Sequence, residues 1–229
     1  LITHMADRGV ITIAGLCVYP VKSCRGVAVT EALLTAAGLE HDREWMVVTP
    51  EGRFVTQRDE PRLALLAARL DADALTLSAA GAGGVSVPLD LRGAATTVTV
   101  WRDRCRAFDQ GEDAARWLGE FVGRPLRLVR FDTAGRRLSD TAWTGGVEAS
   151  NRFSDGFALL AISRASLDDL NAEFDGLLAS MQTPQARKGV EAAFNASPAE
   201  LGRAAVKAAK KHRAPARKRA RGRSAAAQA

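Results

Sequence analysis

Short runs of apolar and β-branched residues alternate with turn-forming residues over the first two-thirds of the chain. Runs of this length and composition, bounded by Pro, Gly and Asp, predict β-strands. We expect strands at residues 10–19, 27–34, 45–49, 54–57, 74–78, 85–91, 96–100 (continuing toward 108), 126–131 and 157–162. The glycine-rich segment 79–84 predicts a hairpin loop. So many short strands at regular spacing are typical of a β-barrel or sandwich.

Two segments instead carry apolar residues at helical spacing. The first covers residues 112–122, where Gly123 and Pro125 end the pattern. The second starts with Ser166 as N-cap and has Asp169 three residues later. The residues expected to face inward are Ala115, Leu118, Phe121 and Val122 in the first helix and Leu167, Leu170 and Phe174 in the second. Polar, glycine-bearing residues 132–152 predict a loop between the two helices, before the buried strand expected at 157–162.

Charge is unevenly distributed, so the net charge of +6 does not describe the body of the protein. Residues 1–174 carry 20 Lys and Arg against 23 Asp and Glu, whereas residues 175–229 carry 12 against 3. Residues 203–223 hold ten basic residues and no acidic one. With few large apolar residues to bury, residues 175–229 are expected to form a flexible basic tail, largely disordered or helical. Such a tail either binds polyanions non-specifically, by counterion release, or is a solubilising or out-of-frame segment.

The three cysteines are Cys17, Cys24 and Cys105, which are too scattered for a disulfide framework or a zinc site. Their odd number, and the lack of a secretory pattern in residues 1–9, predict a reducing, cytoplasmic location. No apolar run is long enough to span a membrane as a helix. Cys17 and Cys105 are expected in strands, with Cys17 in the core. Cys24 lies between basic residues, a setting that can lower the pKa of a thiol, but we expect a structural role for it.

One group of polar residues stands where two predicted strands meet turns. Lys22 and Ser23 follow the turn at Pro20, and Arg43 precedes the strand at 45–49. Lysine, serine hydroxyl and arginine are the groups that hold a phosphate or an anionic ring system. Spacing alone leaves two interpretations open, an anion site or a surface turn with solvated charges. The tryptophans Trp45, Trp101 and Trp117 are expected to pack in the core or at the rim of a barrel.

Four sequence blocks follow one another in a specific order. They are Tyr-Pro-Val-Lys-Ser-Cys-Arg-Gly at 19–26, Gly-Leu-x-x-Asp-Arg-x-Trp-Met-Val-Val at 38–48, Gly-Arg-Phe-Val-Thr-Gln-Arg at 52–58 and Pro-Arg-Leu-Ala-Leu at 61–65. Together they resemble the MOSC N-terminal β-barrel module of the mitochondrial amidoxime-reducing components and their bacterial relatives. Residues 153–171 resemble the opening of the MOSC domain proper, so the resemblance covers about 10–174.

The resemblance implies an α+β fold with three parts. A β-dominated N-terminal barrel module would cover residues 10–132, and an incomplete α/β remnant of the MOSC domain would cover 133–174. The basic tail at 175–229 has no counterpart in the family pattern. Serine, aspartate and glycine at 154–156 would then lie in the loop that opens the MOSC domain, where the alternative is a plain turn before a strand.

In that family the protein binds a molybdopterin (molybdenum) cofactor, and intact relatives are oxidoreductases. They reduce N-hydroxylated compounds with electrons from a separate redox protein. The resemblance implies that the residues contacting the pterin and phosphate are Lys22, Ser23 and Arg43, and that those lining the same site are Ser154, Asp155 and Gly156. A glycine there would let the backbone approach a ligand closely. Some members are also associated with pyridoxal phosphate, although nothing marks Lys22 as a Schiff-base lysine.

The sequence departs from the family pattern after Asn171. The family continues to an Arg-Pro-Asn segment and then to a cysteine that binds molybdenum, whereas the last cysteine here is Cys105. A thiolate of this kind holds the metal and tunes its potential. We therefore expect a chain truncated in the MOSC domain, with no catalytic or metal-ligating residue of its own, that does not catalyse the reduction alone. The alternative is a non-catalytic barrel with a polyanion-binding tail at 203–223.

Overall fold

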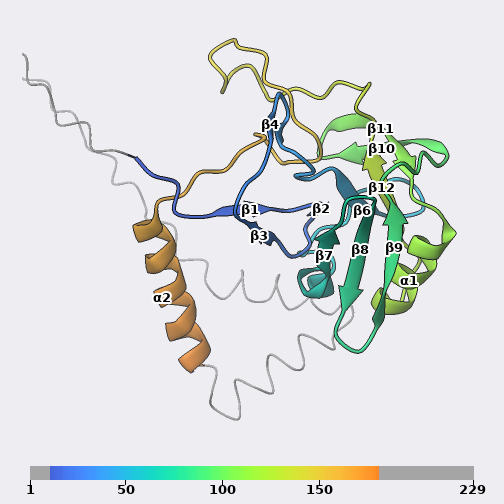
Figure 1. The fold of residues 1–229 in the computed structure, drawn as a ribbon, viewed down its shortest axis with the longest axis horizontal. Coiled ribbons are helices and arrows are strands. Elements are labelled where there is room, and N and C mark those ends of the chain that lie inside the picture. The colour runs from blue at the N-terminus through green and yellow to red at the C-terminus, as the bar shows by residue number, and fades with distance from the viewer. Residues whose placement is uncertain (1–10, 181–229) are drawn as a thin grey trace, which may run out of the picture. The chain divides into compact units, whose positions relative to one another are not determined.

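Strands dominate the computed structural model, which describes residues 11–180 (Figure 1). The strands are β1 (Leu16–Val18), β2 (Val21–Lys22), β3 (Val27–Val29), β4 (Leu34–Thr35), β5 (Gly38–Leu39), β6 (Trp45–Val48), β7 (Ala67–Leu70), β8 (Ala74–Ala79), β9 (Gly83–Pro88), β10 (Ala95–Val100), β11 (Asp103–Asp109) and β12 (Arg127–Phe131). The helices are a 3-10 helix, η1 (Pro61–Leu65), and two α-helices, α1 (Glu112–Val122) and α2 (Arg164–Ser180). The β-dominated α+β fold class predicted from the sequence is confirmed.

Most of the strands belong to two sheets. Five strands form the larger sheet in the order β10-β11-β12-β6-β2, in which only β2 and β6 are parallel. Strands β7, β8 and β9 form an antiparallel meander, and the pairs β1-β3 and β4-β5 form two small ribbons. Strand β6 lies between β12 and β2, so it joins two strands that are far apart in the sequence.

Strand β6 is buried on both faces, which explains its unbroken apolar sequence. Because successive side chains of a strand point to opposite faces, Trp45 and Val47 join one core cluster while Met46 and Val48 join another. The first cluster lies between the meander, α1 and the larger sheet. Helix α1 has the bounds that its apolar spacing predicts, and Gly123 ends it with a φ of 79° that favours glycine.

The second core cluster is completed by a residue far along the chain. Phe153 is fully buried against the larger sheet, where its ring meets Phe131 edge-on at 5.3 Å between centroids. Its backbone N–H donates to the carbonyl of Arg43 at 3.1 Å. The segment that follows the long loop 132–152 is therefore fixed on the sheet by one aromatic side chain.

Several predicted elements are wrong in position or burial. Residues 157–162 form no strand, and their large apolar side chains are exposed. In α2 the N-cap hydroxyl comes from Ser163, which accepts from the backbone N–H of Ser166, and both Leu167 and Leu170 are exposed rather than inward-facing. The apolar spacing of these two segments predicted burial, but burial requires another element to cover them, and residues 11–180 contain none that does. The strand expected at 54–57 is reduced to isolated bridges.

The predicted first strand at 10–19 shortens to β1, and within it Cys17 is exposed, so its expected core position is wrong. Cys17 pairs with Ala28 in a two-stranded ribbon, which leaves one face to solvent. Cys105 lies in β11, as predicted, and is buried there. Among residues 11–180, no helix is long and apolar enough to cross a membrane. The basic segment 203–223 lies outside the described residues, and so does nearly all of the predicted tail 175–229.

Candidate functional site

A buried lysine is the centre of the candidate site. Lys22 lies in β2, which pairs with β6, and only 5% of the residue is exposed. Its Nζ donates to Oδ1 of Asp155 at 2.6 Å, and the indole Nε1 of Trp101 donates to the same oxygen at 2.8 Å. The Phe54 ring lies 5.9 Å from the ammonium and meets Trp101 edge-on. Two residues 133 positions apart in the sequence thus form one ion pair, which aromatic rings flank.

The pKa of Lys22 is set by burial and by neighbouring charges that act on it in opposite directions. Burial lowers the pKa of Lys22, the nearby charges of Arg137 and Arg43 lower it further, and Asp155 only partly opposes them. Burial raises the pKa of Asp155, but hydrogen bonds from Lys22 and Trp101 outweigh this and leave it below its ordinary value. The Asp155 side chain remains 72% exposed. Asp155 is therefore the carboxylate that faces Lys22, whereas Arg43 and Arg137 pair with carboxylates of their own, Asp42 and Asp103.

Arg43 is held in place by its neighbours. Its Nη1 donates to Oδ2 of Asp42 at 2.5 Å, and its guanidinium lies 4.5 Å from the centroid of the Tyr19 ring. The buried Asp42 also accepts the backbone N–H of Tyr19 at 2.7 Å. Asp42 thereby fixes both the strand end that carries Lys22 and the side chain of Arg43. Nothing in the spacing of the sequence identifies this role for Asp42.

Ser23 and Cys24 form the turn after Lys22. The Ser23 carbonyl accepts from Nε2 of Gln57 at 2.9 Å, and the Cys24 N–H donates to the carbonyl of Val21 at 3.1 Å. Burial raises the pKa of the Cys24 thiol to about 12, so it packs as a small apolar residue. The structural role predicted for Cys24 is confirmed, and the alternative of an activated thiol is wrong.

Left-handed backbone conformations concentrate around the site. Within residues 11–180, four residues other than glycine have positive φ: Ser23 at 65°, His41 at 59°, Arg43 at 47° and Trp101 at 54°. Such conformations cost about 1–3 kcal/mol each and persist where the surroundings impose them. Three of the four residues carry side chains of the site.

Arg137 holds the loop that carries Asp155, and sequence reasoning missed it. Its Nη1 donates to the carbonyl of Arg152 at 2.8 Å and to that of Ser154 at 2.5 Å, while Nη2 donates to the carbonyl of Asp155 at 3.0 Å. Its Nε pairs with Oδ2 of Asp103 at 2.7 Å. An arginine in a polar loop carries no sequence signal that its side chain holds another loop through backbone carbonyls.

The structure brings together some of the predicted site residues. Lys22 and Asp155 are in direct contact, and Arg43 is close enough to influence Lys22. Ser154 is buried and contributes its carbonyl to Arg137, whereas Gly156 is exposed and an added Cβ there would meet nothing within 4 Å. The predicted reason for glycine at 156, a close approach of the backbone to another group, is therefore not seen among the protein atoms.

Of the three tryptophans expected to pack in the core or at the rim of a barrel, two do so and one lies at the candidate site. Trp45 is fully buried, and Trp117 packs against the first core cluster, as predicted. Trp101 is 48% exposed, lies in the turn between β10 and β11, and donates from its indole Nε1 to Asp155. The site therefore includes Trp101 and Phe54, which the sequence alone assigned to packing and to a strand.

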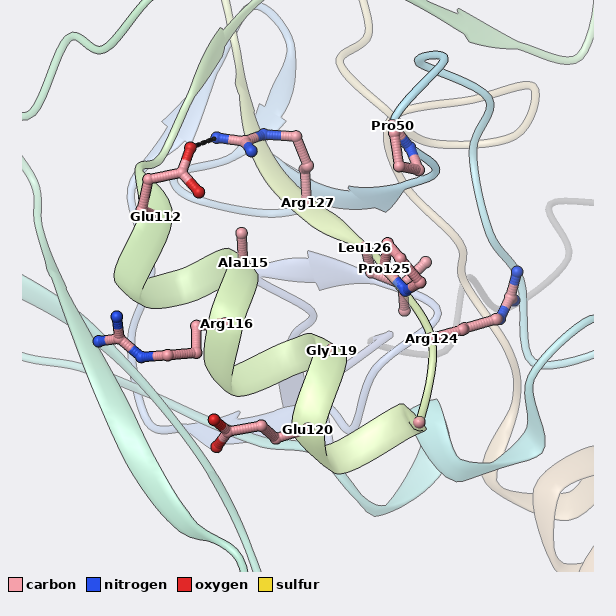
Figure 2. Close-up of a pocket in the computed structure, with 11 residues that line it drawn as sticks. Pro50, Glu112, Ala115, Arg116, Gly119, Glu120, Arg124, Pro125, Leu126 and Arg127 are labelled. Atoms are coloured by element: carbon pink, nitrogen blue, oxygen red, sulfur yellow. Dashed lines mark hydrogen bonds and ion pairs between the residues drawn. The ribbon is translucent and has the colours of Figure 1, made fainter.

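A larger cavity, of about 500 Å³, lies over α1 and the start of β12. Figure 2 shows short side chains and glycine along its floor, with Arg116, Glu120 and Arg124 around the edge and an ion pair between Glu112 and Arg127. None of the predicted cofactor-binding residues lines it. Among residues 11–180, no three His, Cys, Asp or Glu side chains gather in a metal-binding arrangement.

Residues 10–125 match the family model of the MOSC N-terminal beta barrel domain. The chain belongs to the MOSC N-terminal β-barrel family. Within this family, the chain is 39% identical over 178 residues to human mitochondrial amidoxime-reducing component 1, which corresponds to 72% of this chain and 51% of that protein. It is also 39% identical over 133 residues to the molybdenum cofactor sulfurase of Danio rerio, 54% of this chain and 16% of that protein.

This MOSC-barrel chain thus spans about half the length of the amidoxime-reducing components that it matches. A solved structure of a Bordetella bronchiseptica protein is similar with a TM-score of 0.37 and 24% identity, over 46% of this chain and 92% of that one. The resemblance drawn from the four sequence blocks is confirmed by the family match, which includes all four.

Proposed function

We propose that this MOSC-barrel chain binds the phosphate-bearing end of a molybdopterin-type cofactor beside Lys22. The observation that carries the proposal is the buried Lys22 ammonium, whose pKa is lowered by burial and by two guanidinium groups. An anion placed there would offset the effect of the two guanidinium groups on the Lys22 ammonium. A phosphate group matches a lysine point charge combined with an arginine fork.

The residues present fit such a group at its anionic end. Lys22 and Arg43 would contact the phosphate, and the Ser23 hydroxyl would donate to it from a left-handed turn. The half-exposed Trp101 ring offers a face for a flat heterocycle. Ser154, Asp155 and Gly156 would line the site through the loop that Arg137 holds. When bound, the cofactor supplies a redox-active molybdenum centre, and these residues orient its phosphate.

Asp155 has a distinct role in this proposal. It neutralises Lys22 at 2.6 Å, yet most of its side chain is in solvent, so it can move aside when a phosphate approaches. Trp101 would then lose its hydrogen-bond partner on the carboxylate and could donate to the ligand instead.

The barrel module would cover residues 10–132, because β12 ends at Phe131 and pairs with β6 and β11 in the same sheet. Residues 133–174 would be the start of the MOSC domain.

The oxidoreductase activity suggested by the amidoxime-reducing relatives is also a proposal, with electrons delivered by a separate redox protein. Its chemistry needs a thiolate ligand, and the nearest cysteine to Lys22 in the sequence, Cys24, is buried with a raised pKa. We propose that these residues bind and orient the cofactor and do not by themselves catalyse the reduction. The alternative of polyanion binding by residues 203–223 rests on their sequence alone.

Binding is tested by the pterin and molybdenum content of the full chain, purified from a host that makes the cofactor. We expect pterin in the unmodified chain and at least a ~10-fold loss in the Lys22→Gln, Arg43→Gln double variant, because each charge-assisted hydrogen bond contributes about 1.5–3 kcal/mol. The matched control is Arg69→Gln, Arg116→Gln, which removes two exposed charges and should leave the content unchanged. A pterin-free unmodified chain, or equal content in both double variants, would contradict the proposal.

The titration of Lys22 gives an independent prediction. Lys22 should titrate below its ordinary value of 10.5, and lower still in Asp155→Asn, because the carboxylate is the group that raises its pKa. Lysine Nζ or Cε NMR would measure this, with Lys22→Arg to assign the signal. Asp90→Asn, an exposed carboxylate outside the site, is the control that should leave the titration unchanged.

The sign of the effect on stability follows from the same shift. Because the unfolded chain holds the Lys22 proton to higher pH than the folded chain does, stability rises with pH between the lowered pKa and 10.5. Replacing Lys22 with Gln should remove this rise. Titration of Lys22 at or above 10.5 would show that burial and the two arginines do not act on it as described.

A further inference from the structure

A second, smaller cavity of about 280 Å³ is lined in part by residues 150–152, which precede Asp155 in the sequence. It is bounded by the β4-β5 ribbon, the end of β12 and the loop 133–152. Its lining residues are Thr35, Ala36, Ala37, Phe131, Thr133, Gly135, Arg136, Arg137, Ser150, Asn151 and Arg152. Three of them are arginines, three are hydroxyl residues, and none is a carboxylate. This composition is that of an anion site rather than of an apolar pocket.

Arg152 is the residue that makes the cavity unusual. The residue is 8% exposed, and its side chain donates one hydrogen bond within residues 11–180, from Nη1 to the carbonyl of Leu39 at 3.0 Å. No carboxylate within residues 11–180 forms an ion pair with it, whereas Arg136 pairs with Glu148 and Arg137 with Asp103. Buried charges in folded proteins are normally paired, because an isolated one is costly. Among residues 11–180, Arg152 therefore has no carboxylate partner for its charge beside this polar cavity.

We propose that this cavity binds a phosphate-type oxyanion, with Arg152 as its main charge partner. The fork of Arg136, which is exposed and paired only with an exposed glutamate, can turn toward the same ion. The hydroxyls of Thr133 and Ser150 supply neutral donors at the wall. The ion is either free inorganic phosphate or the phosphate of a small ester.

The cavity shares its wall with the site around Lys22. Arg137 lines the cavity and also donates to the carbonyls of Ser154 and Asp155. Asn151 accepts from Arg137 and donates to the hydroxyl of Ser139 at 3.1 Å. An oxyanion bound here would order residues 150–155, and thereby the carboxylate that faces Lys22. The proposal does not depend on molybdopterin binding, because its ligand lies against different side chains.

The test is a titration of the full chain with inorganic phosphate at constant ionic strength, followed by backbone and arginine Nε–H NMR. We expect saturable shifts at Gly135, Arg136 and residues 150–152, with half-saturation around 1 mM. Phenyl phosphate is the second arm: shifts at the same residues would identify an ester phosphate as the source, and shifts with inorganic phosphate alone would identify the free ion. Absence of saturable shifts at these residues would overturn the proposal.

Variants separate the two sites. The double variant Lys22→Gln, Arg43→Gln should keep the phosphate response at 150–152, whereas Arg152→Gln should weaken it by at least ~10-fold. Arg136→Gln, a change at an exposed residue that should leave folding intact, is expected to weaken it several-fold. Arg116→Gln, on α1, is the control that should leave it unchanged. A response lost in the Lys22 and Arg43 variant and kept in Arg152→Gln would overturn this proposal while supporting the first.

Discussion

Replacing Arg137 with Met is expected to lower the free energy of unfolding by about 3–4 kcal/mol. The side chain of Arg137 is buried, and it satisfies the carbonyls of Arg152, Ser154 and Asp155 together with the Asn151 side chain. Each buried acceptor left without its donor costs about 1–3 kcal/mol, although water can reach part of this loop. Denaturant unfolding of the full chain measures the loss, and hydrogen exchange measures the release of residues 151–155.

The neighbouring arginine provides the control for this variant. Arg136 has the same side chain and one exposed ion pair, so Arg136→Met should change stability by less than about 0.5 kcal/mol. Pterin content should fall in Arg137→Met and not in Arg136→Met, because only Arg137 positions the loop that carries Asp155. Equal losses of stability in the two variants would show that Arg137 contributes only a surface charge.

The second large effect is expected in strand β6. Trp45→Ala should lower the free energy of unfolding by about 3–5 kcal/mol, because it opens a cavity in the first core cluster. The change also removes the donor to Oε1 of the buried Gln110, at 3.1 Å, and the ring face that lies 4.8 Å from the Arg130 guanidinium. Thermal or denaturant unfolding followed by circular dichroism measures this loss.

An exposed tryptophan offers the comparison. Trp143 is largely solvated in the loop 132–152, so Trp143→Ala should change stability by less than about 0.5 kcal/mol. Trp45→Phe keeps most of the buried ring and should fall between the two alanine variants. If Trp45→Ala were as stable as Trp143→Ala, the two-faced burial of β6 would be wrong.

Elements whose residues contact mainly near neighbours could be predicted from the sequence. Helix α1 was predicted with its observed bounds, because its apolar stripe and its terminal glycine are local signals. The same reasoning failed at 157–162 and in α2, where apolar spacing was interpreted as burial. Local pattern shows which residues would be buried if another element covered them, and within residues 11–180 none covers these.

For the candidate site, the resemblance pointed to Lys22, Ser23 and Arg43 and to the loop at 154–156. It did not show that Lys22 and Asp155 form an ion pair, since that contact joins residues 133 positions apart. Trp101 was assigned to packing because an isolated tryptophan at a turn has no distinctive spacing. Arg137 was missed because it holds the loop by hydrogen bonds to backbone carbonyls. Any residue type has a backbone carbonyl, so the sequence of the loop does not indicate these contacts.

The sequence by itself determined the β-dominated fold, the helix at 112–122 and the family, because these follow from local periodicity and from the order of specific blocks. Only the tertiary structure decided which charges are buried, which are paired and which are not. Parallel pairing of β2 with β6 buries Lys22, and the anchoring of Phe153 in the second core cluster brings Asp155 to it. Burial and pairing depend on contacts between distant segments, and those contacts set the electrostatics of both proposed anion sites.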